Sequence, residues 1–145
     1  MNISDSSIPR IAIIGGGFGG LQLNKNLTPG KFQIVLIDKH NYHTFQPLLY
    51  QVATAGLEPD SIAYPLRKIF KNRGDFFFRL AEVLSIDTER KKIHTTSWDL
   101  EYDHLVLSTG TVTNFFGNET IAAKSMGIHT DPEALNIRPF VLENF

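Results

Sequence analysis

Glycines at positions 15, 17 and 20 form a Gly-x-Gly-x-x-Gly pattern between two apolar segments. The pattern follows the apolar segment 11–14 directly, and Asp38 comes 18 positions after Gly20, at the end of the next apolar segment. In this setting the glycines permit a tight turn, close approach of backbone N–H groups to a pyrophosphate, and close packing of a helix on a strand. A helix that begins at such a turn presents N–H donors and a positive partial charge to phosphates. The spacing therefore predicts a site for the phosphates of a dinucleotide.

Asp38 narrows the choice of dinucleotide. A carboxylate at this position can accept hydrogen bonds from ribose hydroxyls, and it repels a 2′-phosphate. An NADP-type ligand is therefore disfavoured, whereas both FAD and NAD fit the glycine pattern. Three alternatives stay open at this point: an NAD-binding Rossmann dehydrogenase domain, a non-catalytic binding or assembly module, and a glycine turn without a ligand.

Other residue types that could do chemistry form no recognisable constellation. The five histidines show no i,i+4 pairing, and the chain has no cysteine, so we expect no metal site. Without cysteines the chain has neither a disulfide nor a dithiol redox centre. No residue can be identified from the sequence as a catalytic acid, base or nucleophile, so the catalytic residues are unknown.

The elements that must position the glycine turn follow from hydrophobic periodicity. Segments 10–14 and 32–37 read as buried parallel strands, and the helix between them carries Leu23 and Leu27 on one face. This strand–helix–strand unit has the size of a right-handed crossover. Asn24 stands where a small residue is common in such a helix, so its side chain either turns toward solvent or the local packing differs.

Further segments extend and flank this sheet. Segment 76–80 reads as a third strand and 104–108 as another buried strand, while 83–86, 92–96 and 100–102 read as a small antiparallel meander. The sequence therefore predicts an α/β fold with a mostly parallel sheet, helices and a small antiparallel β-meander.

Three further segments carry local predictions. Segment 41–51 is aromatic and irregular, and a helical stretch follows Pro59–Ser61 as far as Phe70, bent at Pro65. Thr130 and Glu133 have the spacing of a capping box and open a last helix. That helical pattern reaches the end of the sequence without a cap, which favours a truncated chain over a complete protein.

Size and composition set outer limits. A chain of 145 residues suits one domain, and a net charge of −1 gives no reason to expect a nucleic-acid partner. The longest apolar run is too short to span a bilayer, and the N-terminus lacks the basic and apolar blocks of a signal peptide. We therefore expect a cytoplasmic protein.

A longer stretch distinguishes FAD from NAD. The segment Asn41-Tyr42-His43-Thr44-Phe45-Gln46-Pro47-Leu48-Leu49-Tyr50-Gln51-Val52-Ala53-Thr54-Ala55-Gly56 resembles that of type II NADH:quinone oxidoreductases, the single-subunit respiratory flavoproteins. The glycine turn followed by Leu21, the segment 102–110 and the segment 114–117 resemble the same family. The resemblance covers nearly the whole chain, and disulfide-reducing and sulfide-oxidising relatives rely on cysteines that this chain lacks.

The resemblance implies a glutathione-reductase-like, Rossmann-like FAD-binding domain over residues 1–145, incomplete at its C-terminus. In that family the glycine turn holds the FAD pyrophosphate, Asp38 and Lys39 the adenosine ribose, and Val83 the adenine. Thr109 and Gly110 close over the pyrophosphate, and the block with Gln46, Pro47 and Tyr50 lies near the isoalloxazine ring. The implied cofactor-binding residues are Gly15, Gly17, Phe18, Gly19, Gly20, Asp38, Lys39, Gln46, Pro47, Val83, Thr109 and Gly110. For Phe45 and Tyr50, core packing is an equal alternative, and we expect a surface or indirect role for His43.

The implied activity belongs to a longer protein, which transfers a hydride from NADH to FAD and on to a membrane quinone. Its NADH-binding domain and C-terminal membrane-attaching part are missing from these residues, so we expect the fragment alone to be inactive and to hold FAD weakly if at all. The parent protein is expected on the cytoplasmic face of a membrane as a peripheral protein. Self-association of the fragment into a homo-oligomer through a bare apolar face is a further alternative.

Overall fold

A computed structural model describes residue 3 and residues 6–144 of the chain. The chain divides into two compact units. Unit 1 consists of Met1–His43 and Pro65–Gly110, and unit 2 of Thr44–Tyr64 and Thr111–Phe145. Two of the three unit boundaries fall within short paired strands, β3 (Tyr42–Thr44) and β4 (Ala63–Pro65), and the third falls between Gly110 and Thr111.

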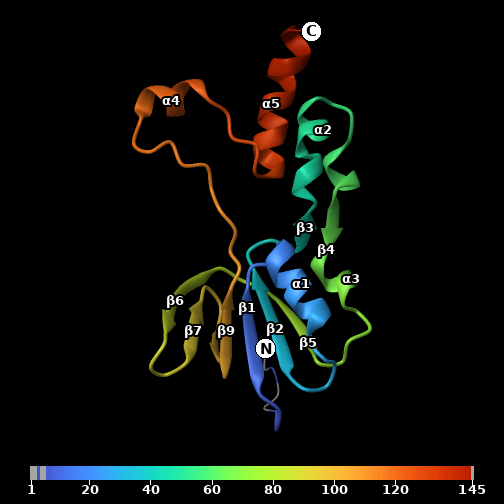
Figure 1. The fold of residues 1–145 in the computed structure, drawn as a ribbon, viewed down its shortest axis with the longest axis vertical. Helices are drawn as coiled ribbons and strands as arrows, with labels where there is room; N and C mark the ends of the chain where they lie inside the picture. Colours follow the sequence, from blue (N-terminus) through green and yellow to red (C-terminus); the bar gives the residue numbers. More distant parts are fainter. Residues whose placement is uncertain (1–2, 4–5, 145) are drawn as a thin grey trace. The chain divides into compact units, whose positions relative to one another are not determined.

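Unit 1 is built on a parallel sheet with the strand order β5-β2-β1-β9. The helix α1 joins β1 to β2, and the four strands lie side by side in Figure 1. Ile14 pairs with Ile37 on one side and with Leu107 on the other, so the carboxyl ends of the strands meet at one edge. The elements are β1 (Arg10–Ile14), α1 (Phe18–Asn26), β2 (Gln33–Asp38), β5 (Phe76–Leu80) and β9 (His104–Leu107).

Both faces of this sheet are covered. Alternate residues of β1 point to opposite faces, so Ile13 packs with Leu21 of α1 and with Leu66 of α3 (Leu66–Ile69), while Ala12 packs on the other face with Ile93. Ile93 belongs to an antiparallel meander of β6 (Val83–Asp87), β7 (Lys92–Thr95) and β8 (Asp99–Glu101). A parallel sheet covered on both faces explains why β1 and β2 read as continuous apolar runs.

Unit 2 has its own small core. Leu49, Val52 and Ala134 are buried together, and they join α2 to α5. The elements of the unit are η1 (Gln46–Leu48), α2 (Leu49–Ala53), η2 (Pro59–Ser61), α4 (Glu119–Lys124) and α5 (Asp131–Asn144). None of the described helices is long and apolar enough to cross a membrane.

The predicted α/β fold, with its parallel sheet and antiparallel meander, is confirmed. The capping box is also present, because the Glu133 carboxylate accepts from the Thr130 N–H at 3.0 Å and the Glu133 N–H donates to the Thr130 hydroxyl at 3.4 Å. The aromatic segment 41–51 contains β3, η1 and the start of α2, each only a few residues long.

Two predictions of secondary structure or burial were wrong. The expected bent helix over 59–70 is a 3₁₀ turn, the strand β4 and a single turn of helix, because Pro65 has a ψ of 122° and drives the residue before it toward extended backbone. The expected buried strand at 104–108 is the outer strand β9, where Leu107 is 63% exposed. The helix α4 had been missed, although Asn118 caps it by accepting the N–H of Ile121 at 3.0 Å.

Candidate functional site

The glycine turn lies at the carboxyl edge of the parallel sheet, and two of its positions, Gly15 and Gly20, have room for glycine only. Gly15 has a φ of +105°, and a Cβ there would lie 2.2 Å from the backbone oxygen of Ser108. A Cβ on Gly20 would lie 2.1 Å from the Gly15 oxygen, so any side chain would push α1 away from β1. The first and last glycines of the pattern are therefore required by the fold itself, as the fingerprint predicts.

Gly17 differs from both, because nothing in the structure fills the space beside it. A Cβ on Gly17 would meet no atom within 4 Å, and its φ of −75° suits any residue. Gly17 is the N-cap of α1, where no side chain caps the helix and the first turn holds no acidic residue. The open space beside Gly17 therefore lies at the positive end of the helix dipole.

Asp38 is tied directly to this turn. Its two carboxylate oxygens accept the N–H of Gly16 at 2.6 Å and the N–H of His40 at 2.8 Å. A carboxylate has about four acceptor positions, so Asp38 keeps capacity for ribose hydroxyls after making these two bonds. The structure therefore gives Asp38 a role in shaping the loop that its predicted contact with the ribose did not include.

The remaining predicted residues of unit 1 lie along the same edge. Leu80 pairs with Asp38, and the Ala81 N–H donates to the Asp38 oxygen at 3.0 Å, which brings the half-buried Val83 close to the end of β2. The Ser108 N–H donates to the Ile14 oxygen at 2.8 Å, so the chain enters Thr109 and Gly110 beside the glycine turn. Lys39, the residue after Asp38, is exposed.

Sequence reasoning did not find Ser108 as a site residue. The Ser108 hydroxyl donates its proton between two backbone oxygens, that of Gly15 at 2.9 Å and that of Ile14 at 3.1 Å. In the sequence, the one sign of this role is a small polar residue between a strand and Gly110, and that sign is weak by itself.

His43 also contacts the glycine turn. Its Nδ1 lies 3.1 Å from the Gly16 oxygen, which requires the tautomer with the proton on Nδ1. The His43 ring meets the Phe18 ring edge-on at 5.0 Å between centroids. The side chain thus touches the loop that would hold phosphates, and its spacing from the glycines gave no hint of this contact.

Gln46 and Pro47 belong to unit 2, whereas the other predicted site residues belong to unit 1. Both are exposed on η1, and the Gln46 amide donates to the His129 oxygen at 3.1 Å. Tyr50 and Phe45 are 56% and 43% exposed, so neither is a core residue of unit 2.

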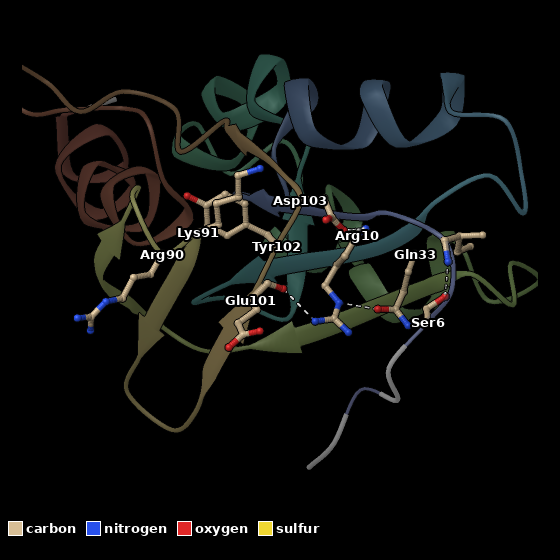
Figure 2. Close-up of a pocket in the computed structure, with 9 residues that line it drawn as sticks. Ser6, Arg10, Gln33, Arg90, Lys91, Glu101, Tyr102 and Asp103 are labelled. Carbon is tan, nitrogen blue, oxygen red and sulfur yellow. Dashed lines mark hydrogen bonds between the residues drawn. The ribbon is translucent and has the colours of Figure 1, made fainter.

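Unit 1 also contains a cavity of about 420 Å³, whose lining includes Tyr102 and Asp103 (Figure 2). Its lining includes Arg10 and Gln33, which begin β1 and β2, while the glycine turn follows the other end of β1. Arg10 donates to the Gln33 side chain and to the Glu101 oxygen, so its guanidinium is already hydrogen-bonded to other residues that line the cavity. This cavity is therefore no part of the dinucleotide site.

Comparison with known proteins gives a consistent result. The family model for pyridine nucleotide-disulphide oxidoreductase matches residues 9–138. The type II NADH:quinone oxidoreductase NdhA of Mycobacterium tuberculosis is 37% identical over 140 residues, which cover 94% of this chain and 30% of the relative. The predicted resemblance to type II NADH:quinone oxidoreductases is confirmed as homology along nearly the whole chain, which spans about 30% of the length of these relatives.

Solved structures agree with the fold. NDH2 from Plasmodium falciparum in complex with NADH has a TM-score of 0.80 and 27% identity, covering 90% of this chain and 28% of that chain. The sulfide:quinone oxidoreductase of Aquifex aeolicus has a TM-score of 0.79 and 28% identity, covering 93% and 32%.

Proposed function

The chain belongs to the pyridine nucleotide-disulphide oxidoreductase family, and we propose that its glycine turn binds the pyrophosphate of FAD. The observation that carries this proposal is the open space at Gly17, which is the N-cap of α1. Backbone N–H groups at a helix N-terminus bind phosphate oxygens, and a dinucleotide needs a glycine at the point of closest approach.

In this proposal the residues at the carboxyl edge of the parallel sheet bind and orient the cofactor. Asp38 keeps Gly16 in place and offers its remaining acceptor positions to ribose hydroxyls. Ser108 holds the backbone of Gly15 from the neighbouring strand, and His43 contacts the Gly16 oxygen from β3. In this proposal Phe18, Gly19, Lys39, Val83, Thr109 and Gly110 line the adenosine and pyrophosphate portions, and Gln46 and Pro47 face the isoalloxazine ring.

For the whole protein we propose NADH:quinone oxidoreduction, the activity in the names of its relatives. Bound FAD would supply the chemistry by taking a hydride from NADH and passing the electrons to a quinone. This chain supplies binding and orientation, and we expect no quinone reduction from its 145 residues alone, since they cover about 30% of the relatives. Peripheral attachment to a membrane stays a prediction for the whole protein, and self-association stays one for this chain alone.

Titration of the purified chain with FAD, followed by quenching of flavin fluorescence, tests the binding site. Gly17→Ala should leave the fold intact, because its Cβ meets nothing within 4 Å, yet weaken FAD at least about ten-fold by blocking the pyrophosphate. Gly74→Ala is the matched control, since a Cβ there also meets nothing within 4 Å.

Two outcomes would contradict the proposal. Equal FAD affinity in the Gly17→Ala and Gly74→Ala variants would remove the glycine turn from the site. Tighter binding of NAD⁺ than of FAD by the unaltered chain would favour the NAD-binding alternative instead.

A further inference from the structure

Two side-chain hydrogen bonds join the segment before α2 to the start of α5 within unit 2. The Thr44 hydroxyl donates to Asp131 Oδ2 at 2.8 Å, and the Gln46 amide donates to the His129 oxygen at 3.1 Å. The partners are 87 and 83 residues apart in the sequence. Thr44 and Gln46 flank Phe45, and Pro47 follows, so both bonds hold the segment proposed to face the flavin.

The start of α5 is itself held firmly enough to act as a support. The Glu133 carboxylate accepts the N–H of His129 at 2.7 Å and that of Thr130 at 3.0 Å. The bond from the His129 N–H holds the pKa of Glu133 below its usual range, as expected for a carboxylate stabilised by backbone donors. One turn further, Ala134 is fully buried against α2.

Asp131 is an unusual choice for such a position. The residue is only 8% exposed, and its Oδ1 has no hydrogen-bond partner among the described residues. An acidic residue in the first turn stabilises a helix by its interaction with the helix dipole, but an exposed residue would do so without the cost of burying a charge. The burial of Asp131 is therefore explained by what its other oxygen does, which is to hold Thr44.

We propose that Asp131 is a positioning residue, which braces Thr44 against α5 and so sets the position of the segment 45–47. The part of this inference that concerns cofactor binding rests on the proposed function. The brace itself is a property of unit 2 and can be tested without a cofactor.

Amide hydrogen exchange tests the brace directly. The Phe45 N–H donates to the Ile62 oxygen at 2.8 Å and the Leu48 N–H to the Phe45 oxygen at 3.0 Å, so both report on this segment. Asp131→Ala should speed exchange at Phe45 and Leu48 by about ten-fold, because the segment loses its anchor. Asp131→Asn keeps an acceptor for the Thr44 hydroxyl and should restore most of the protection.

Arg138→Ala is the matched control for general loosening of α5. Arg138 also ties α5 to the α2 region, by donating to the Val52 oxygen at 3.1 Å and the Leu57 oxygen at 2.8 Å. This variant should speed exchange at Leu57 and leave Phe45 and Leu48 unchanged. Unchanged exchange at Phe45 and Leu48 in Asp131→Ala, or equal acceleration there in both variants, would overturn the brace.

Titration with FAD tests whether the brace between Asp131 and Thr44 contributes to cofactor binding. Asp131→Ala should weaken FAD several-fold, Asp131→Asn much less, and Arg138→Ala not at all. Thr44→Val should weaken FAD as Asp131→Ala does, and the double variant should lose no more than either. Wild-type affinity in Asp131→Ala would refute the positioning role, whereas equal FAD affinity in Gly17→Ala and Gly74→Ala would refute the proposed function and leave the exchange result to decide on the brace.

Discussion

Asn24 of α1 is completely buried, and neither atom of its side-chain amide has a hydrogen-bond partner among the described residues. Its backbone is satisfied, because Arg73 donates to the Asn24 oxygen at 2.6 Å. The side chain therefore did not turn toward solvent, and the packing of α1 on the sheet accommodates a polar group where a small apolar one would fit. A buried amide without partners costs about 1–3 kcal/mol.

We expect Asn24→Ala to raise the free energy of unfolding by about 1 kcal/mol, since the removed amide and the better helix propensity outweigh a small cavity. Urea denaturation measures the change. Asn26→Ala makes the same substitution at the exposed C-terminal end of the same helix, where it also removes the bond from the Asn26 amide to the Gln22 oxygen at 2.8 Å, so it should not stabilise the chain. A loss of stability in Asn24→Ala alone would mean that the amide has a partner, such as a buried water.

At the scale of elements, the turn before β5 holds the C-terminal end of α1. Arg73 donates to the Asn24 and Leu27 oxygens, and its guanidinium pairs with Asp75 at 2.8 Å. Asp75 also accepts the Gly30 N–H at 2.8 Å. The hydrogen bond from Arg73, helped by the one from Gly30, lowers the pKa of Asp75 from 3.8 to about 2. A lowered pKa means that the charged carboxylate stabilises the folded chain.

The stabilisation by Asp75 should therefore be complete above pH 3.8 and be lost as the pH falls toward about 2. In Asp75→Asn, unfolding measured by denaturant at a series of pH values should depend less on pH in this range. Asp87→Asn is a control with the same change of charge, because the Asp87–Arg90 pair is longer, at 3.9 Å, and Arg90 is exposed. Identical pH profiles for Asp75→Asn and the unaltered chain would contradict this role.

The elements also show where local reasoning fails. The spacing of the apolar residues Ile62, Leu66 and Ile69 fits a helix. Pro65 has extended backbone and interrupts that helix, so the segment forms a 3₁₀ turn before it and a single helical turn after it. The apolar run of β9 fits a central strand, yet its place in the sheet is at the edge. Strand order is set by packing between distant segments, which the local pattern does not encode.

At the scale of the whole molecule, the chain has separate cores in its two units. Val35 of β2 and Val52 of α2 are both fully buried, the first in unit 1 and the second in unit 2. Neither cluster of buried side chains contains residues of the other unit. Separate cores predict that the units open separately.

Val35→Ala and Val52→Ala make the same deletion in each core, and each should cost about 2 kcal/mol. Amide hydrogen exchange should accelerate in the parallel sheet for Val35→Ala, and in α2 and α5 for Val52→Ala. Equal acceleration in both units for either variant would show that the whole chain unfolds as one cooperative unit.

The order of residues along the chain is enough to predict the glycine turn, the strands and helix that flank it, the meander and the capping box. These features depend on neighbours a few residues away, through backbone sterics and the alternation of buried side chains. It also placed Asp38 at the end of β2, because the acidic residue follows the apolar run directly.

Which distant side chains contact the glycine turn and the segment 45–47 depends instead on how the chain packs in three dimensions. Ser108 reaches Gly15 because β9 pairs with β1, and Asp131 reaches Thr44 because α5 packs on α2. Contacts between residues more than 80 positions apart depend on strand order and helix packing. Those are settled by burial of the whole core, so the spacing of residues along the chain cannot reveal them.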